Sequence, residues 1–366
     1  MKKRNSPEMS CRMNKVGGQA VLEGIMMKAG AKCATAVRTP DGSVAVDSHE
    51  FISVRKKHKF LNIPILRGII NFVETLRLSF QTLTLSAELG GLDLEEDETK
   101  FEKWLKNKCG VRFFDILMVI AAILGIGLSI FLFMYLPALC ADGLDYLIPG
   151  ALGAWRAVIE GVIKIVIFIS YIVLVSLMSD IRRTFEYHGA EHKTIACFEA
   201  GVELTPENAR RYSRFHPRCG TSFMFVMILL GIFAGLFVRL ALPDLPNYLY
   251  VVIRLLILPL VVGLGYEFIM LAGKHDVLLT RILSAPGLWM QRLTTKEPNE
   301  SQLEVAIIAT KCALREEFPD FDPTPYLENA KHMKEKKAEE ASDTKSEEPS
   351  CQDKAEPKQT NDSEAI

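Results

Sequence analysis

Four long apolar stretches limit what this chain can fold into. A helix needs about 20 apolar residues to cross the ~30 Å hydrocarbon core of a bilayer. Each stretch meets this length: they cover residues 116–139, 158–178, 223–242 and 250–272. Polar residues and prolines follow the first and the third stretch. The sequence therefore predicts a mainly α-helical, polytopic membrane protein with four transmembrane helices in two hairpins.

The positions of Lys and Arg predict the orientation, because cytosolic loops are enriched in these residues. The loop 180–222 between the two hairpins is rich in Arg, whereas the short loops within the hairpins hold little besides Arg156. More basic residues precede the first stretch and follow the last: Lys106, Lys108, Arg112, Lys274 and Arg281. We expect a multi-pass protein of the cytoplasmic membrane, with both termini and this loop in the cytosol.

The composition limits the kinds of binding partner and the cellular compartment that the sequence predicts. The net charge of −1 gives no overall attraction to nucleic acid. The expected partners are the lipid bilayer and either a cytosolic protein or a substrate at the inner leaflet. The eight cysteines include no C-x-x-C pair and no disulfide framework, which suits a reducing cytosol. Residues 1–14 lack an apolar core, so no cleavable signal peptide is expected.

The part before the first span, residues 1–115, is expected to be a small cytosolic α+β segment. A turn at 40–42 separates two β-like runs and predicts a β-hairpin over 34–46. Apolar residues at helical spacing predict an amphipathic helix over 64–89, either packed on the core or lying in the interface. Around Glu23, the run 17–27 fits a buried strand or a short helix, or a segment that brings this carboxylate to the histidines described below.

The remaining boundaries follow from composition. Residues 116–272 form the membrane domain, and 273–318 are expected to hold interfacial and cytosolic helices. From 319 to 366 we expect a disordered, charged tail, since apolar residues become rare there.

The loop 180–222 carries the residues with the clearest chemistry. His188 and His192 are four apart, so on a helix they share one face and can bind one ion. Glu191 completes the pattern H-x-x-E-H, the inverted zinc-protease signature, in which the Glu is the general base. The pattern predicts a divalent metal site, with zinc as the first choice and Glu191 as the catalytic residue.

The third ligand is open at this stage. A catalytic zinc has three protein ligands and one open position. Glu199 lies seven residues past His192 and so near the same helical face. His216, Cys219 and Glu23 are the alternatives. Without a metal, the same side chains would make structural hydrogen bonds where the loop meets the headgroups.

Cys219 has a second interpretation. It could be a nucleophile with His216 as its base and with Arg214 and Arg218 nearby. The simpler interpretation is an inert cysteine at the start of a helix.

Four motifs, taken in order, resemble the YqhQ-like family of bacterial membrane proteins, a domain of unknown function (1385). They are GGQAVLEGIM at 17–26, YHGAEHK at 187–193, RFHPRCGTSF at 214–223 and PGLWMQ with LTTKEP at 286–298. The family is sometimes described as predicted metal-dependent enzymes. The resemblance implies a bacterial cytoplasmic membrane location and the same candidate residues in the loop, but no substrate.

Two candidate functions are consistent with these predictions. The first is a cytosol-facing metal-dependent hydrolase that acts on a peptide or a lipid-linked substrate at the inner leaflet. The second is a non-catalytic scaffold or regulator whose loop binds a cytosolic partner, with or without a structural metal. A closed four-ligand site would favour the scaffold, and a three-ligand site with Glu191 free would favour the hydrolase. A transporter is disfavoured because the spans are expected to lack central charges.

Overall fold

The computed structural model describes residues 12–13, 15–91, 111–149, 152, 155–216, 219–274 and 278–346. Residues 92–110, Pro217 and Arg218, and the last part of the charged tail lie outside these residues.

A four-stranded antiparallel sheet opens the described chain, with its strands side by side in chain order. The strands are β1 (Val16–Val21), β2 (Gly24–Ala29), β3 (Lys32–Arg38) and β4 (Val44–Glu50). The expected hairpin is β3–β4, and its turn uses Gly42 at φ 84°, where a glycine is favoured. The run 17–27, left open between strand and short helix, forms most of the β1–β2 hairpin.

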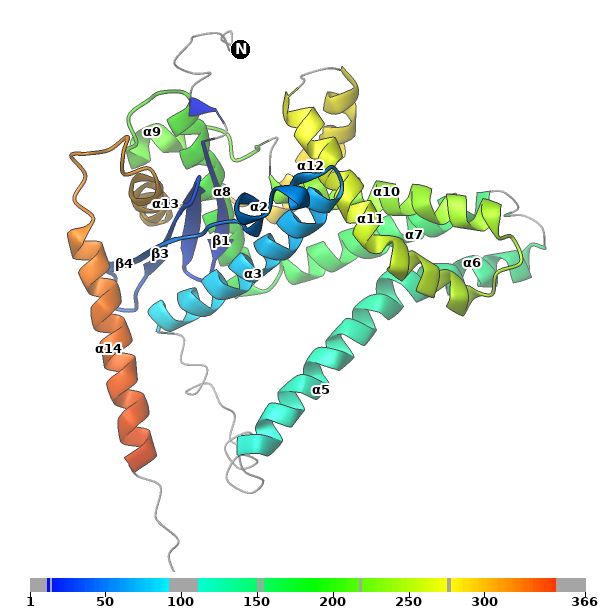
Figure 1. The fold of residues 1–366 in the computed structure, drawn as a ribbon, viewed down its shortest axis with the longest axis horizontal. Coiled ribbons are helices and arrows are strands. Elements are labelled where there is room, and N and C mark those ends of the chain that lie inside the picture. The colour runs from blue at the N-terminus through cyan, green and yellow to red at the C-terminus, as the bar shows by residue number, and fades with distance from the viewer. Residues whose placement is uncertain are drawn as a thin grey trace, which may run out of the picture.

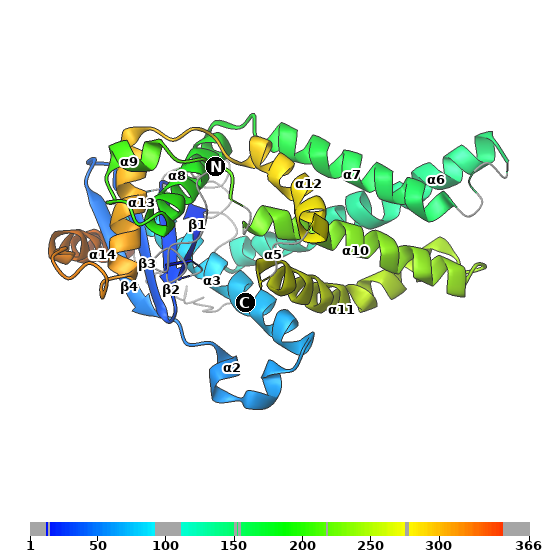
Figure 2. The same cartoon turned by 90° about the horizontal axis from the view of Figure 1, so that it is seen from above.

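Helices cover both faces of this sheet. On one face, Ile25 and Met27 of β2 pack in a core with α8 (Ser179–Glu199) and α13 (Glu300–Ala313). On the other, Met26 packs with Leu78 of α3 (Leu66–Leu89). Because side chains alternate along a strand, β2 is buried on both sides. The sheet therefore lies between α8 and α13 on one side and α3 on the other (Figures 1 and 2).

Four helical segments are long and apolar enough to cross a membrane, as predicted. The first consists of α5 (Val111–Ile130), the π-helical turn η2 (Phe131–Tyr135) and α6 (Leu136–Leu147). The others are α7 (Arg156–Val175), α10 (Gly220–Ala241) and α11 (Asn247–Lys274). In Figure 1, α7, α10 and α11 run side by side away from the sheet, and α5 diverges from them below the bend at η2. Pro137 follows this bend, and a proline has no N–H for a regular helical hydrogen bond.

The amphipathic helix predicted over 64–89 is α3, and it joins the sheet to the bundle. Gly68 packs directly on Gly263 of α11, where the structure has no room for a larger side chain. One turn further along α11, Glu267 pairs with Arg67. We call the end of the bundle beside the sheet the near end, and the opposite end, where α10 connects to α11, the far end.

The C-terminal part contains two further helices. α12 (Leu278–Thr294) crosses α10 at the near end. α14 (Thr324–Ser346) lies along β4, with Ala330 buried against Val37 and Ala45. A disordered tail was expected from residue 319, but residues 324–346 form this helix. The reason is that a few apolar residues early in the tail pack on the edge of the sheet. Two short helices, α2 (Val54–Lys57) and α9 (Pro206–Arg210), and the 3-10 turn η1 (Lys59–Asn62) complete the described elements.

Candidate metal site at the near end of the bundle

Helix α8 positions the histidine pattern. The helix ends in a Schellman motif: Gly201 adopts φ 70°, its N–H donates to Phe198 O, and the next N–H, of Val202, donates to Cys197 O. This well-defined stop fixes the register of the last turns. Those turns are buried between the sheet and the segments that follow α8.

The two faces of α8 have different roles. Tyr187 and Phe198 face the core shared with the sheet and α13. His188, Glu191 and His192 lie at positions i, i+3 and i+4, so they share the neighbouring face, which lines a cavity. The one-turn spacing thus places both imidazoles and the carboxylate together without help from tertiary contacts.

Cys219 completes a cluster with these histidines. The possible ligand atoms of His188, His192 and Cys219 all lie within 4.8 Å of one another. Within the cluster, His188 Nε2 lies 3.2 Å from Cys219 Sγ. A tetrahedral zinc bound at typical Zn–N and Zn–S lengths would hold these two atoms about 3.5 Å apart. The cluster therefore needs little adjustment to hold one ion.

Backbone carbonyls orient both rings. His188 Nδ1 lies 2.9 Å from Thr294 O, and His192 Nδ1 lies 2.5 Å from Arg214 O. A carbonyl only accepts, so Nδ1 donates in each ring, and in the neutral form of the ring Nε2 keeps its lone pair. Metal-binding histidines are held in this way in most sites. Burial also lowers the pKa of His192, which favours the neutral, ligand-competent ring.

Cys219 is placed by the start of a membrane span. It is the N-cap residue of α10, and its sulfur accepts hydrogen bonds from the N–H and the hydroxyl of Thr221. The first turn of α10 therefore fixes the thiol beside the two rings. The sulfur lies against His188 and His192, which supports a ligand role over that of a nucleophile activated by His216.

Glu191 lies deeper on the same face. It is 5% exposed, and its carboxyl packs against Gly18 of β1, whose backbone N–H donates to it. A Cβ at Gly18 would lie 2.8 Å from Met27, 2.9 Å from Met26 O and 3.0 Å from this carboxyl carbon, so a larger residue would crowd the site. Burial raises the pKa of Glu191 to about 7, opposed by the charge of His188 and the hydrogen bond from Gly18.

The cavity in front of the cluster has a volume of about 1070 Å³. Residues of β1, β2, α3 and α8 line it, together with residues at the near ends of α10 and α11. Polar groups of the cluster form one part of the wall, and apolar side chains form another, among them Met26, Leu78, Met224 and Met270. The site is thus open to a ligand of substantial size at the junction of the sheet and the bundle.

His216 lines the same cavity beside the cluster, and Glu199 lies next to His216. The ring of His216 is 5.6 Å from that of His192, and its Nε2 is 3.8 Å from a carboxylate oxygen of Glu199. The backbone of His216 is fixed by Gln291, which accepts from its N–H and donates to its carbonyl, both at 2.8 Å. Both residues lie within reach of the cluster, but its three closely spaced ligand atoms come from other residues.

Glu23 lies at the other end of the α8–sheet contact. It occupies the β1–β2 turn at φ 50°, pairs with Arg183 and accepts a hydrogen bond from Tyr187. These contacts tie the turn to the first half of α8. Glu23 therefore contacts Arg183 and Tyr187, and the structure does not place it in the histidine cluster.

The segment 291–298 organises the site, and its role was not predicted. Besides binding His188 through Thr294 O, it accepts a hydrogen bond from Arg214 at Thr295 O. Lys296 O lies against Gly189, where an added Cβ would be 2.0 Å away. Glu297 pairs with the buried Lys193 at 2.6 Å. The signal was present as the motif at 286–298, but the sequence gives no indication that it packs on α8.

The residues present fit a zinc-type ion. Two imidazoles, each held by a carbonyl at Nδ1, and one cysteine sulfur form a nitrogen–sulfur donor set of the kind that zinc prefers. With three protein ligands facing a cavity, one coordination position would remain for a ligand from solution.

Comparison with known proteins identifies relatives but not a function. A family described as "Protein of unknown function (DUF1385)" matches residues 63–316. The "Uncharacterized protein YqhQ" of Bacillus subtilis (strain 168) is 38% identical over 297 residues, which cover 80% of this chain and 89% of that protein. No solved structure matches the chain.

Proposed function

The chain belongs to the DUF1385 family of proteins of unknown function, and from its site we propose a membrane-embedded, metal-dependent hydrolase that works at the near face of the bilayer. The excess of basic residues in the loop 180–222 supports a cytosolic position for this face.

One observation carries the proposal: among the residues that the structure describes, three ligand atoms lie within 4.8 Å of one another, not four. Structural zinc sites use four protein ligands, whereas catalytic sites use three and keep one position open. His216, the fourth residue of a closed site, instead lies beside Glu199. The three-ligand arrangement supports a hydrolase over a scaffold.

The protein residues then have separate roles. His188, His192 and Cys219 would hold the ion, and Thr294 and Arg214 keep the two rings oriented through their carbonyls. When bound, the ion would polarise a substrate carbonyl and favour ionisation of a nearby water. Glu191 lines the same cavity and would receive and return the proton at its carboxylate.

The cavity supports a substrate presented at the membrane. Its apolar wall includes Met224 and Met270, which belong to the near ends of two spans. A peptide segment or the polar head of a lipid-linked molecule could enter there while its apolar part stays in the inner leaflet.

The decisive experiment replaces Glu191 with Gln. This change keeps the size and hydrogen-bonding reach of the side chain but removes the base. A hydrolase should keep its metal and lose activity by roughly 10²–10⁴, the usual contribution of a positioned acid–base group. A strain lacking the protein is complemented with each variant, lipids and peptides that accumulate are profiled, and metal is measured in the purified protein.

Glu186→Gln is the matched control, because it makes the same chemical change on the same helix, at a residue paired with Gln302 outside the cavity. It should behave as wild type. If Glu191→Gln also retains metal and clears the accumulated compound normally, the hydrolase proposal fails and the scaffold remains. If Glu191→Gln loses the metal, this carboxylate is a ligand or holds one in place.

A further inference from the structure

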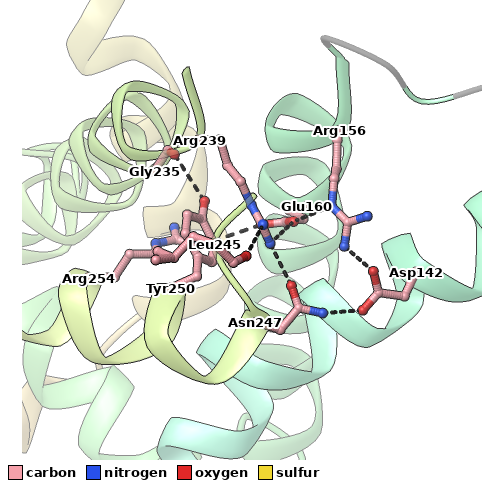
Figure 3. Close-up of polar contacts among 9 residues, drawn as sticks. All are labelled: Asp142, Arg156, Glu160, Gly235, Arg239, Leu245, Asn247, Tyr250 and Arg254. Carbon is pink, nitrogen blue, oxygen red and sulfur yellow. Dashed lines mark hydrogen bonds and ion pairs between the residues drawn. The ribbon is translucent and has the colours of Figure 1, made fainter. Parts of the chain in front are cut away.

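The far end of the bundle contains a second cluster of polar side chains, drawn in Figure 3. At its centre is Glu160 of α7, which is 2% exposed. Three arginines from three helices converge on this carboxylate: Arg156 of α7 at 3.3 Å, Arg239 of α10 at 3.8 Å and Arg254 of α11 at 3.8 Å. Glu160 is a buried charge close to the far end of its span, and it was not singled out from the sequence.

The cluster links all four spans. Arg156 also binds Asp142 of α6, and Asn247 at the start of α11 connects Asp142 to Arg239. Tyr250 donates to Gly235 O, and both Arg239 and Arg254 lie over its ring. Polar contacts thus hold together the far ends of helices that are otherwise apolar.

Small residues let the helices approach closely enough for these contacts. A Cβ at Gly235 would lie 2.8 Å from the Tyr250 hydroxyl and 3.1 Å from the guanidinium of Arg254. At Gly161, one would lie 2.7 Å from Ile232. The sequence of α7 and α10 is therefore shaped around the cluster.

The charges of this cluster do not balance. Lys164, one turn from Glu160, interacts electrostatically with Glu160 and Arg254, and it has no hydrogen bond or ion pair among the described residues. Together with the three arginines it faces only two carboxylates in the described part of the chain, those of Glu160 and Asp142. Buried positive charge without a counter-charge is strongly unfavourable in surroundings of low dielectric constant.

Two buried atoms in the cluster also lack hydrogen-bond partners in the described structure: Glu160 Oε2 and Arg239 Nε. Such atoms are rare in folded proteins, because each carries a desolvation cost. Glu160 is divided among three guanidinium groups, two of them at distances too long for good hydrogen bonds. One carboxylate therefore does not saturate the donors around it.

Exposed aromatic residues indicate how deep in the bilayer the cluster lies. Tyr146, Trp155 and Tyr248 are all exposed at the far end, as expected for side chains at the level of the headgroups. Arg156 directly follows Trp155, and it is the most exposed of the three arginines of the cluster. The cluster therefore begins near headgroup level and extends into the bundle.

We propose that the far end of the bundle binds the phosphate group of an anionic ligand, with Arg156, Arg239, Arg254 and Lys164 supplying the positive charge. Guanidinium groups match phosphate oxygens in geometry and bind them with charge-assisted hydrogen bonds. The phosphate belongs either to a phospholipid headgroup or to free inorganic phosphate. This site is independent of the proposed hydrolase site.

The test is binding of defined probes to the full chain in detergent, measured by native mass spectrometry. The probes are phosphatidylglycerol, phosphatidylcholine with the same acyl chains, and inorganic phosphate. The key variants change affinity in opposite directions. Lys164→Gln removes a cation and should weaken binding about tenfold, the usual effect of removing one charged partner. Glu160→Gln removes the carboxylate that competes for the arginines, so it should tighten binding several-fold.

Arg292→Gln is the control, since it removes an exposed arginine on α12, which lies at the near end. The affinity of this variant for each probe should equal that of the wild-type protein. Preference for phosphatidylglycerol over phosphatidylcholine, with no binding of inorganic phosphate, identifies a lipid site; binding of inorganic phosphate identifies a soluble anion. Lys164 makes no hydrogen bond or ion pair in the described structure, so Lys164→Gln remains informative if Glu160→Gln does not fold. The proposal is overturned if neither probe binds above phosphatidylcholine, or if Lys164→Gln binds like wild type.

Discussion

The two ends of the bundle place polar side chains in apolar surroundings in opposite ways. At the near end, His188, His192 and Cys219 are short side chains, and each is fixed by backbone groups or a helix start. At the far end, long arginine side chains share one carboxylate at 3.3–3.8 Å. The near end therefore holds its polar groups in fixed positions, whereas the far end concentrates positive charge on long, adaptable side chains.

This difference matches the ligands proposed for each end. Metal ligands must lie within a few tenths of an ångström of fixed bond lengths, which requires side chains that cannot move. Guanidinium and ammonium groups attract an anion through their charge over several ångströms, so an adaptable arrangement is enough. A variant at one end should therefore leave the ligand of the other end unaffected.

The largest expected effect tests whether the two ends lie on opposite sides of the membrane. A single cysteine is introduced as Tyr146→Cys at the far end or as Glu207→Cys in α9, with the native cysteines replaced. In intact cells, a membrane-impermeant thiol reagent should label Tyr146→Cys fully and Glu207→Cys only after lysis, because basic loops stay in the cytosol. Labelling in the reverse order would invert the orientation and move the cavity to the outside.

The next effect concerns metal content. Wild-type protein purified in detergent should carry about one zinc-type ion per chain, and His188→Ala with His192→Ala should carry almost none, because two of three ligands are removed. Elemental analysis by mass spectrometry measures this directly. Lys164→Gln, at the far end, should keep full metal content. Equal metal in the double variant and in wild type would place the ion elsewhere.

The smallest expected effect concerns Glu23. Its pair with the half-exposed Arg183 lies at the surface and is worth at most about 1 kcal/mol of unfolding free energy. Glu23→Gln should therefore lower the melting temperature slightly and leave metal content unchanged. Arg183→Gln should have about the same cost, and the double variant little more, because each change removes the same ion pair. A metal-free Glu23→Gln protein would make this residue a ligand candidate again.

Local features could be predicted from the amino-acid sequence without any knowledge of the packing. The four spans follow from length and hydropathy, which need no partner to be recognised. The turn at Gly42 defines the β3–β4 hairpin, which was predicted from its turn residues. The common face of His188, Glu191 and His192 follows from helical spacing alone. In each case the cause lies within a few residues of the effect.

The distant residues that join these features became clear only from the packing of the elements. Spacing could not choose among Glu199, His216, Cys219 and Glu23, because the choice depends on where α10 begins and on how the segment 291–298 packs along α8. Glu160 was likewise not recognised as the centre of a cluster, since two of its partners come from α10 and α11, far along the chain. Helix packing sets such contacts, and the pattern within any one helix does not contain them.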